Sequence, residues 1–276
     1  MKKEVNYDIP ASLIEAYREY KIVVRFPDPS EITKIFYDTV PEGLAYVRIL
    51  SLEGRMEDLK GWCPGIPIDL VVRDVWEDLP RLYRYAPLLA THPLRVTVPL
   101  VSGFEAVAKV ASSLNFAVKV EGGQPDPALT GELLEMARIY LYRTTVSEPI
   151  DFFHSLFRAF YQPEPVTLWV IQEEEPALFR TISDGGEERL PGRLAGLEIR
   201  DGFSSFTRNW LDALLAQKGE CAGCDFLINC AGYFKWPREA YDCQGIRAVM
   251  GTLRKAAREL RREVDSLPAQ GEREAS

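Results

Sequence analysis

The chain has 276 residues, of which 46% are hydrophobic and 27% charged, and its formal net charge is −8. This length fits one large domain or a medium domain with an appendage, and the composition is typical of a folded protein. The negative charge argues against nucleic acid as the main partner, and no apolar run is long enough for a membrane span. The sequence begins MKKEVNYDIP, with no apolar run behind the lysines, so we expect no secretory signal and a cytoplasmic protein.

Residues 1–43 have a mixed pattern, which we treat as an N-terminal helix and strand segment. The sequence predicts a helix at residues 11–20 and a strand at residues 21–26, followed by a proline-rich turn. After the turn, Ser30 has the position of an N-cap for a short helix through residue 36.

From residue 44 to residue 180, patterns typical of strands and helices alternate. Short apolar runs bounded by Gly, Pro or Asn predict strands at residues 45–50, 68–72, 94–98, 116–120 and 166–171. Helix-length segments lie at residues 75–90, 102–114, 127–142 and 148–161. This alternation predicts βαβ units and therefore an α/β fold with a parallel sheet. Five or six such units are too few for a closed eight-fold barrel, so we expect a partial (β/α) barrel-like parallel sheet.

A small cysteine-rich C-terminal region follows at residues 181–265. Residues 179–192, FRTISDGGEERLPG, predict a hairpin with a Gly-Gly turn. Helices are expected at residues 203–217, with Ser204 or Ser205 as N-cap, and at residues 245–265. The tail, residues 266–276, is polar, and we expect it to be disordered.

Four of the five cysteines lie between these two helices in the pattern C-x2-C-x5-C-x12-C: Cys221, Cys224, Cys230 and Cys243. Four thiolates suit either Zn²⁺ or an iron–sulfur cluster. Zinc sites usually have a second C-x2-C pair or two histidines, whereas here the second half is open and neither His92 nor His154 is near. The spacing therefore favours a [4Fe–4S] cluster, with structural zinc as the alternative. Disulfides or unligated thiols are disfavoured, since cytosolic thiols are normally reduced.

The residues around these cysteines are rich in apolar side chains: Phe226, Leu227, Ile228, Tyr233, Phe234 and Trp236. Such side chains limit the access of water to a metal and tune its potential, or they simply fill a small core. Lys235 and Arg238 either offset the negative charge of a thiolate cluster or are ordinary surface charges.

The run Cys221-x2-Cys224-x5-Cys230, followed by Ala231-Gly232 and a fourth cysteine, resembles the SPASM domain. That domain is the C-terminal iron–sulfur extension of radical SAM enzymes that modify peptides and proteins. The predicted order of partial barrel, hairpin, helix and cysteine loop is also similar. The resemblance implies one [4Fe–4S] site, bound by the four cysteines, in a protein whose partners are a radical SAM enzyme and a precursor peptide or peptide chaperone.

The chain departs from that family in two ways. Radical SAM enzymes hold their reactive cluster in a C-x3-C-x2-C motif, but the loop after residue 50 contains only Cys63 and the motif occurs nowhere in the chain. Full SPASM domains also hold a second cluster, one of whose ligands would fall at Phe234, and no cysteine lies between Cys63 and Cys221. The chain thus resembles the SPASM-only companion protein of GeoRSP-type systems, with no catalytic residue of its own for radical initiation.

Two alternatives to an accessory protein remain open: a stand-alone electron-transfer protein, and an α/β enzyme for a small molecule with a structural zinc. Two further motifs have double interpretations. Gly122-Gly123 follows a predicted strand and is either a plain turn or a place of close approach to a bound peptide. The run Glu173–Glu175 predicts a solvated edge, or else a docking patch for a basic partner.

Overall fold

The protein, seen in a computed structural model that describes residues 5–36, 40–143, 146–162, 165–197 and 203–266, is built on one eight-stranded sheet. The strands are β1 Asn6–Pro10, β2 Lys21–Phe26, β3 Leu44–Ile49, β4 Ile68–Val71, β5 Leu94–Pro99, β6 Ala117–Glu121, β7 Phe179–Ile182 and β8 Glu188–Arg189. Their spatial order is β6-β5-β4-β3-β2-β1-β7-β8, and all neighbours are parallel except β7 and β8. The predicted α/β fold with a mostly parallel sheet and a hairpin after it is confirmed.

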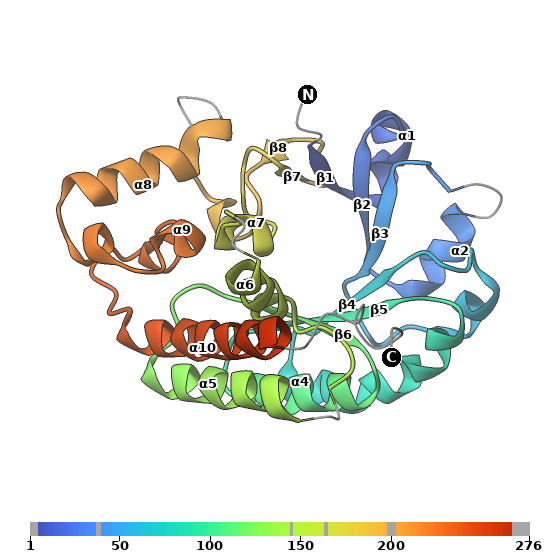
Figure 1. Cartoon of the computed structure of the whole chain (residues 1–276). Helices are drawn as coiled ribbons and strands as arrows, with labels where there is room; N and C mark the ends of the chain where they lie inside the picture. The colour runs from blue at the N-terminus through green and yellow to red at the C-terminus, as the bar shows by residue number, and fades with distance from the viewer. Residues whose placement is uncertain (1–4, 37–39, 144–145, 163–164, 198–202, 267–276) are drawn as a thin grey trace, which may run out of the picture.

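The α-helices of the described residues lie between and after the strands (Figure 1). They are α1 Ile14–Tyr17, α2 Ile32–Ile35, α3 Val75–Asp78, α4 Phe104–Ser113, α5 Pro127–Tyr142, α6 Asp151–Tyr161, α7 Leu168–Ile171, α8 Phe206–Ala216, α9 Leu227–Cys230 and α10 Gln244–Ser266. Helix α10 packs along α5 and α6, which joins the end of the chain to the α/β unit. Among these residues no helix combines the length and apolar character needed to cross a membrane.

Local sequence explains where several helices begin. Asp126 accepts a hydrogen bond from Leu129 N at 2.9 Å and Pro127 takes the first helical position of α5. The predicted helix over residues 75–90 is α3 followed by a 3₁₀ helix, Leu79–Ala90, because two prolines in this segment lack the N–H that an α-helix requires.

The sheet departs from the predictions in two places. Residues 166–171 were predicted as a strand, but the structure has a loop and then α7, in which Trp169 is fully buried. A short apolar run suits a buried strand or a buried helix equally, and packing decides between them. Strand β1 was not predicted, because NYDIP contains a single aliphatic strand residue, Ile9; its partners β2 and β7 define it as a strand. Strands β1 and β2 lie within residues 1–43, so that segment is part of the same sheet.

One predicted N-cap is wrong, one is confirmed in position, and one prediction falls outside the described residues. The turn before α2 is capped by Asp28, whose carboxylate accepts from Ser30 N at 2.8 Å, so Ser30 is the donor and not the cap. Ser205 occupies the N-cap position of α8 without a side-chain capping bond to that helix. Of the tail predicted to be disordered, Ser266 ends α10, and residues 267–276 lie outside the described residues.

The sheet is curved into a partial barrel. Arg48 of β3 and Lys119 of β6 both reach the carboxylate of Glu173, although these strands lie three places apart in the sheet. In a flat sheet three strand spacings would place the backbones of β3 and β6 about 14 Å apart. Curvature therefore turns one face of the sheet inward, and charged side chains from several strands meet there.

Candidate functional site

The four cysteines come together in space. Cys221 lies in a 3₁₀ turn, Glu220–Gly223, and Cys224 follows it; Cys230 ends α9, and Cys243 immediately precedes α10. All four line one hollow, are partly buried, and carry free thiols. Cys63 does not line this hollow. The spacing in the sequence thus marked a set of residues that the fold gathers, while the fifth cysteine stays apart.

The turn after Cys230 requires its glycine. Ala231 and Gly232 both have left-handed backbones, with φ of 46° and 73°. A Cβ on Gly232 would lie 2.6 Å from the side chain of Leu214, and the Gly232 carbonyl accepts a hydrogen bond from Trp210 Nε1 at 3.1 Å. This close approach to α8 reverses the chain and leads it back toward the hollow.

Burial favours the protonated thiol at Cys221, Cys230 and Cys243 when no metal is bound. Burial raises the pKa of Cys230 to about 11 and that of Cys243 to about 12, and it also raises the pKa of Cys221. Neighbouring thiols act in the same direction on each of them, while Lys235 lowers the pKa of Cys221 and Cys243. Binding of a metal here must therefore release protons.

The donor set suits a thiolate-bound metal, but the side chains must move to receive one. Among the described residues no group of three or more His, Cys, Asp and Glu side chains is arranged to hold a metal ion as it stands. A tetrahedral zinc site needs sulfurs about 3.8 Å apart, since Zn–S bonds are about 2.3 Å long. The free space in the hollow is about 20 Å³, room for roughly one water. Either metal would therefore require the thiol side chains to rearrange.

Most of the predicted apolar cover is present. Phe226 and Phe234 are buried and line the hollow, and Tyr233 is buried against Phe234. Ile228 is 70% exposed, so that part of the prediction is wrong. Lys235 is buried, contrary to a surface charge, and lines the hollow. Arg238 is exposed and donates to Gln124 Oε1 at 3.0 Å, so it takes no part in the hollow.

The segment that carries the four cysteines, residues 220–243, is called the cysteine region below. Hydrogen bonds attach it to the barrel at Trp169 and at the turn after β6. Trp169 Nε1 donates to the Ala231 carbonyl at 2.9 Å, and Tyr233 Oη donates to the Gly122 carbonyl at 3.1 Å. Gln124 Nε2 donates to the Phe234 carbonyl at 2.9 Å. The Gly122-Gly123 turn after β6 is therefore a contact between the barrel and the cysteine region, a function that neither interpretation of its sequence included.

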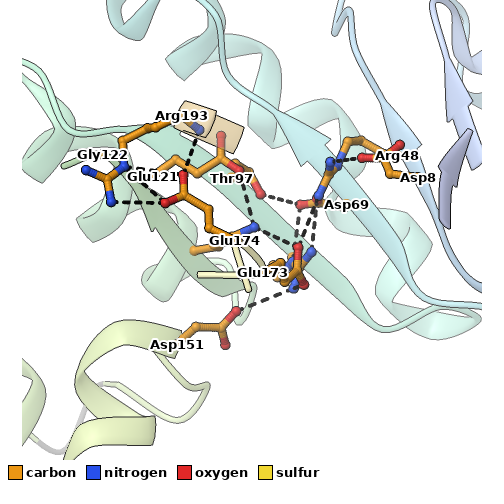
Figure 2. Close-up of polar contacts among 12 residues, drawn as sticks. Asp8, Arg48, Asp69, Thr97, Glu121, Gly122, Asp151, Glu173, Glu174 and Arg193 are labelled. Carbon is orange, nitrogen blue, oxygen red and sulfur yellow. Dashed lines mark hydrogen bonds and ion pairs between the residues drawn. The ribbon is translucent and has the colours of Figure 1, made fainter. Parts of the chain in front are cut away.

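Arg193 is central to this contact. Its guanidinium is paired with buried Glu174 at 3.0 Å, donates to the Trp236 carbonyl at 3.0 Å, and stacks 4.0 Å from the centre of the Tyr233 ring. A Cβ on Gly123 would lie 2.2 Å from Arg193 Nη1, so only glycine leaves room for this side chain. One cation thus links the barrel, the turn after α7 and the cysteine loop. Figure 2 shows its pairing with Glu174.

A second candidate site is the network of charges inside the barrel (Figure 2). Arg48 bridges Asp8, through a short ion pair of 2.5 Å, and Asp69 at 3.0 Å. Asp69 also accepts from Arg95 at 3.1 Å and from the Thr97 hydroxyl at 2.7 Å. These side chains come from β1, β3, β4 and β5, and they alternate along each strand with aliphatic residues that face the helices.

Glu173 closes this network from the turn after α7. Its carboxylate accepts from Lys119 at 2.7 Å, from the Tyr46 hydroxyl at 3.0 Å and from Arg95 at 3.2 Å, and its backbone has a left-handed φ of 60°. The predicted solvated edge at Glu173–Glu175 is therefore wrong. Glu174 pairs with Arg193, and Glu175 accepts from the Thr207 hydroxyl at 2.8 Å.

Burial and pairing act against each other on the acids of the network. Burial alone raises the pKa of Glu173, but Lys119, Arg95 and Arg48 outweigh it and hold that pKa far below its usual range. The pKa of Asp69 is likewise lowered by Arg95 and Arg48 against the effect of burial. Burial prevails at Asp8, whose pKa is raised despite its two arginine partners.

A cavity of about 360 Å³ lies beside the network and is lined by both carboxylates and cations, among them Asp8, Arg25, Lys119 and Glu173. The sequence analysis missed this site, although a signal was present: strands expected to be buried on both faces each carried a charged residue. Arg48, Asp69, Arg95 and Lys119 are those residues. In a parallel sheet such charges indicate an inner polar face.

Comparison of the chain with models of protein families, with curated proteins and with solved structures finds no match.

Proposed function

We propose that this chain is an accessory iron–sulfur protein of a radical SAM peptide-modification system. In this proposal Cys221, Cys224, Cys230 and Cys243 hold one auxiliary [4Fe–4S] cluster. The observation that carries the proposal is that the four cysteines of the SPASM-like motif line one hollow while Cys63 lies elsewhere.

A bound cluster would give the region a redox centre, a structural cross-link, or both. The chain's own residues hold and shield it. The left-handed turn at Ala231-Gly232 brings Cys230 toward the hollow, and Phe226 and Phe234 keep water from one side. No C-x3-C-x2-C motif occurs in the sequence, so the proposed role contains no radical initiation and relies on a partner enzyme for that step.

The charges of the barrel support a scaffold role. Asp8, Arg48, Asp69 and Glu173 are paired with groups of the same chain, and this pairing fixes the strands to one another. The precursor peptide or the partner enzyme would then bind to the barrel from outside, at a surface joined to the cysteine region through Arg193.

Metal analysis after anaerobic purification tests the centre. We expect a brown protein with about four irons and four sulfides per chain. A colourless protein with about one zinc per chain would favour the alternative, an α/β protein with a structural zinc site. The buried network and its adjacent cavity are the features that such a small-molecule enzyme would use.

Co-purification tests the accessory role. The tagged chain, expressed together with a radical SAM enzyme and a small precursor peptide as candidate partners, should retain one of them through a wash in about 0.15 M salt. A chain that binds iron and sulfide but retains neither would be a stand-alone electron carrier. The matched control is the Arg193→Met variant, in which the cysteine region is no longer held to the barrel by that guanidinium.

A further inference from the structure

Lys235 is an unusual lysine, because it is buried and its ammonium connects the two ends of the cysteine loop. It lies in the 3₁₀ turn Tyr233–Lys235 after the third cysteine and is only 6% exposed. Its Nζ forms a short ion pair with the carboxylate of Glu220 and donates to the Tyr241 carbonyl at 2.5 Å. Glu220 directly precedes Cys221, and Tyr241 lies two residues before Cys243.

We propose that Lys235 is the positioning residue of the cysteine centre, tying the segments of Cys221 and Cys243 together and offsetting the negative charge of the bound thiolates. The proposal rests on the proposed function, since it concerns the same metal centre. It assigns Lys235 two measurable effects: retention of the metal, and a reduction potential higher than the same cluster would have without the ammonium.

The first effect follows from the contacts. Cys221 and Cys243 are 22 positions apart, and the first lies in a short turn while the second lies just outside a helix. Without a metal, the bond from Lys235 to Tyr241 and the ion pair with Glu220 bridge these two segments directly. Gln217 Nε2 donates to Glu239 Oε2 at 2.9 Å just upstream of both. Holding both ends near the hollow lowers the entropy that metal binding must remove.

The second effect follows from charge. Four thiolates on a [4Fe–4S]²⁺ core leave a net charge of −2, and reduction adds one more negative charge. A nearby ammonium stabilises the more negative state and therefore raises the potential. Lys235 lines the hollow itself, and burial strengthens its field. Arg247 also lines the hollow but is exposed, so water screens its charge.

Burial of an ammonium is costly unless it is paired, which also argues for a role beyond packing. The only carboxylate in an ion pair with Lys235 among the described residues is Glu220, whose side chain is 39% exposed. Glu220 and the Tyr241 carbonyl together satisfy the ammonium when no metal is bound. Thiolates at Cys221 and Cys243 supply the additional negative charge when the metal is bound.

The test compares four proteins reconstituted anaerobically with iron and sulfide: wild type, Lys235→Met, Lys235→Arg and Glu220→Gln. The readouts are the midpoint potential of the cluster and the rate of iron loss to a chelator. We expect Lys235→Met to shift the potential to more negative values and to lose iron several-fold faster. Lys235→Arg keeps the charge and should keep the potential close to that of the wild type. Glu220→Gln removes a negative charge and should shift the potential in the opposite direction.

The matched control is Lys119→Met, which also removes a buried, carboxylate-paired ammonium but lies in the barrel. It should lower the free energy of unfolding without shifting the potential. A wild-type potential and iron-loss rate in both Lys235→Met and Glu220→Gln would overturn the inference while leaving the cluster in place. If the wild type takes up zinc instead, equal zinc affinities of wild type and Lys235→Met would overturn it. A chain that binds neither metal would overturn this inference and the proposed function together.

Discussion

The carboxylate of Glu173 lies 2.7 Å from the ammonium of Lys119. This ion pair joins the turn after α7 to the side of β6 that faces the inside of the barrel. The two residues are 54 positions apart in the sequence. Lys119 is fully buried, and its other carboxylate partner, Glu121, is half exposed. Glu173 therefore acts as a central anion that satisfies cations from three elements of the barrel.

Removal of this anion should destabilise the fold. We expect Glu173→Ala to lower the free energy of unfolding by about 3 kcal/mol, because Lys119 and Arg95 lose a shared partner inside the barrel. Urea unfolding followed by circular dichroism measures the change. Glu187→Ala is the control, since Glu187 is 72% exposed and pairs with exposed Arg189; it should change stability by less than about 0.5 kcal/mol. Equal effects of the two substitutions would contradict this role of Glu173.

The Glu173 carboxylate also predicts how the free energy of unfolding changes at acid pH. Its pKa is lower in the folded than in the unfolded chain, so its stabilisation is complete above its ordinary value of 4.5 and is lost as the pH falls below that value. The stability difference between wild type and Glu173→Gln should be constant above about pH 5.5 and should shrink toward about pH 3. Asp8 has a raised pKa and acts in the opposite direction, and because Glu173 contributes to that shift, only the part of the Asp8 effect that does not depend on Glu173 cancels in the difference. A difference that widens on acidification would refute the assignment.

Arg193 should decide how firmly the cysteine region is held. Arg193→Met leaves Glu174, which is 6% exposed, without its guanidinium partner and removes the contact with the Trp236 carbonyl. We expect a loss of about 2 to 4 kcal/mol and earlier cleavage of the cysteine region in limited proteolysis. Arg189→Met, which removes an exposed guanidinium, should leave the cleavage pattern unchanged. If both variants are digested alike, Arg193 does not hold the cysteine region to the barrel.

The cysteines themselves give the simplest test of ligand identity. Cys224→Ser should lose the metal and destabilise the C-terminal third, because three thiolates hold a four-ligand centre poorly. Cys63→Ser should change neither iron content nor stability of that region, since Cys63 does not line the hollow. Iron and sulfide analysis of both variants measures this, and an equal loss of iron in each would refute the ligand assignment.

Much of the sheet could be predicted because its strands are short apolar runs that end at turn residues. Strand β2 was predicted with its observed bounds, and β3 to β6 to within one residue at each end. Strand β1 could not be recognised in the same way, because one of its inward positions is the charged Asp8. Helix α7 was mistaken for a strand because LWVI has no periodicity, and only the burial of Trp169 against the cysteine region fixes its conformation.

The sequence by itself determined the α/β class and the set of four cysteines, since both depend on local spacing: apolar runs at regular intervals, and thiols within 23 residues of one another. Only the tertiary structure decided that Glu173 is the centre of a buried network and that Lys235 lies inside the hollow. Charged side chains look alike in a sequence whether water or another charge solvates them. The partners of Glu173 come from distant strands that the curved sheet brings together, whereas those of Lys235 come from the two ends of the cysteine loop.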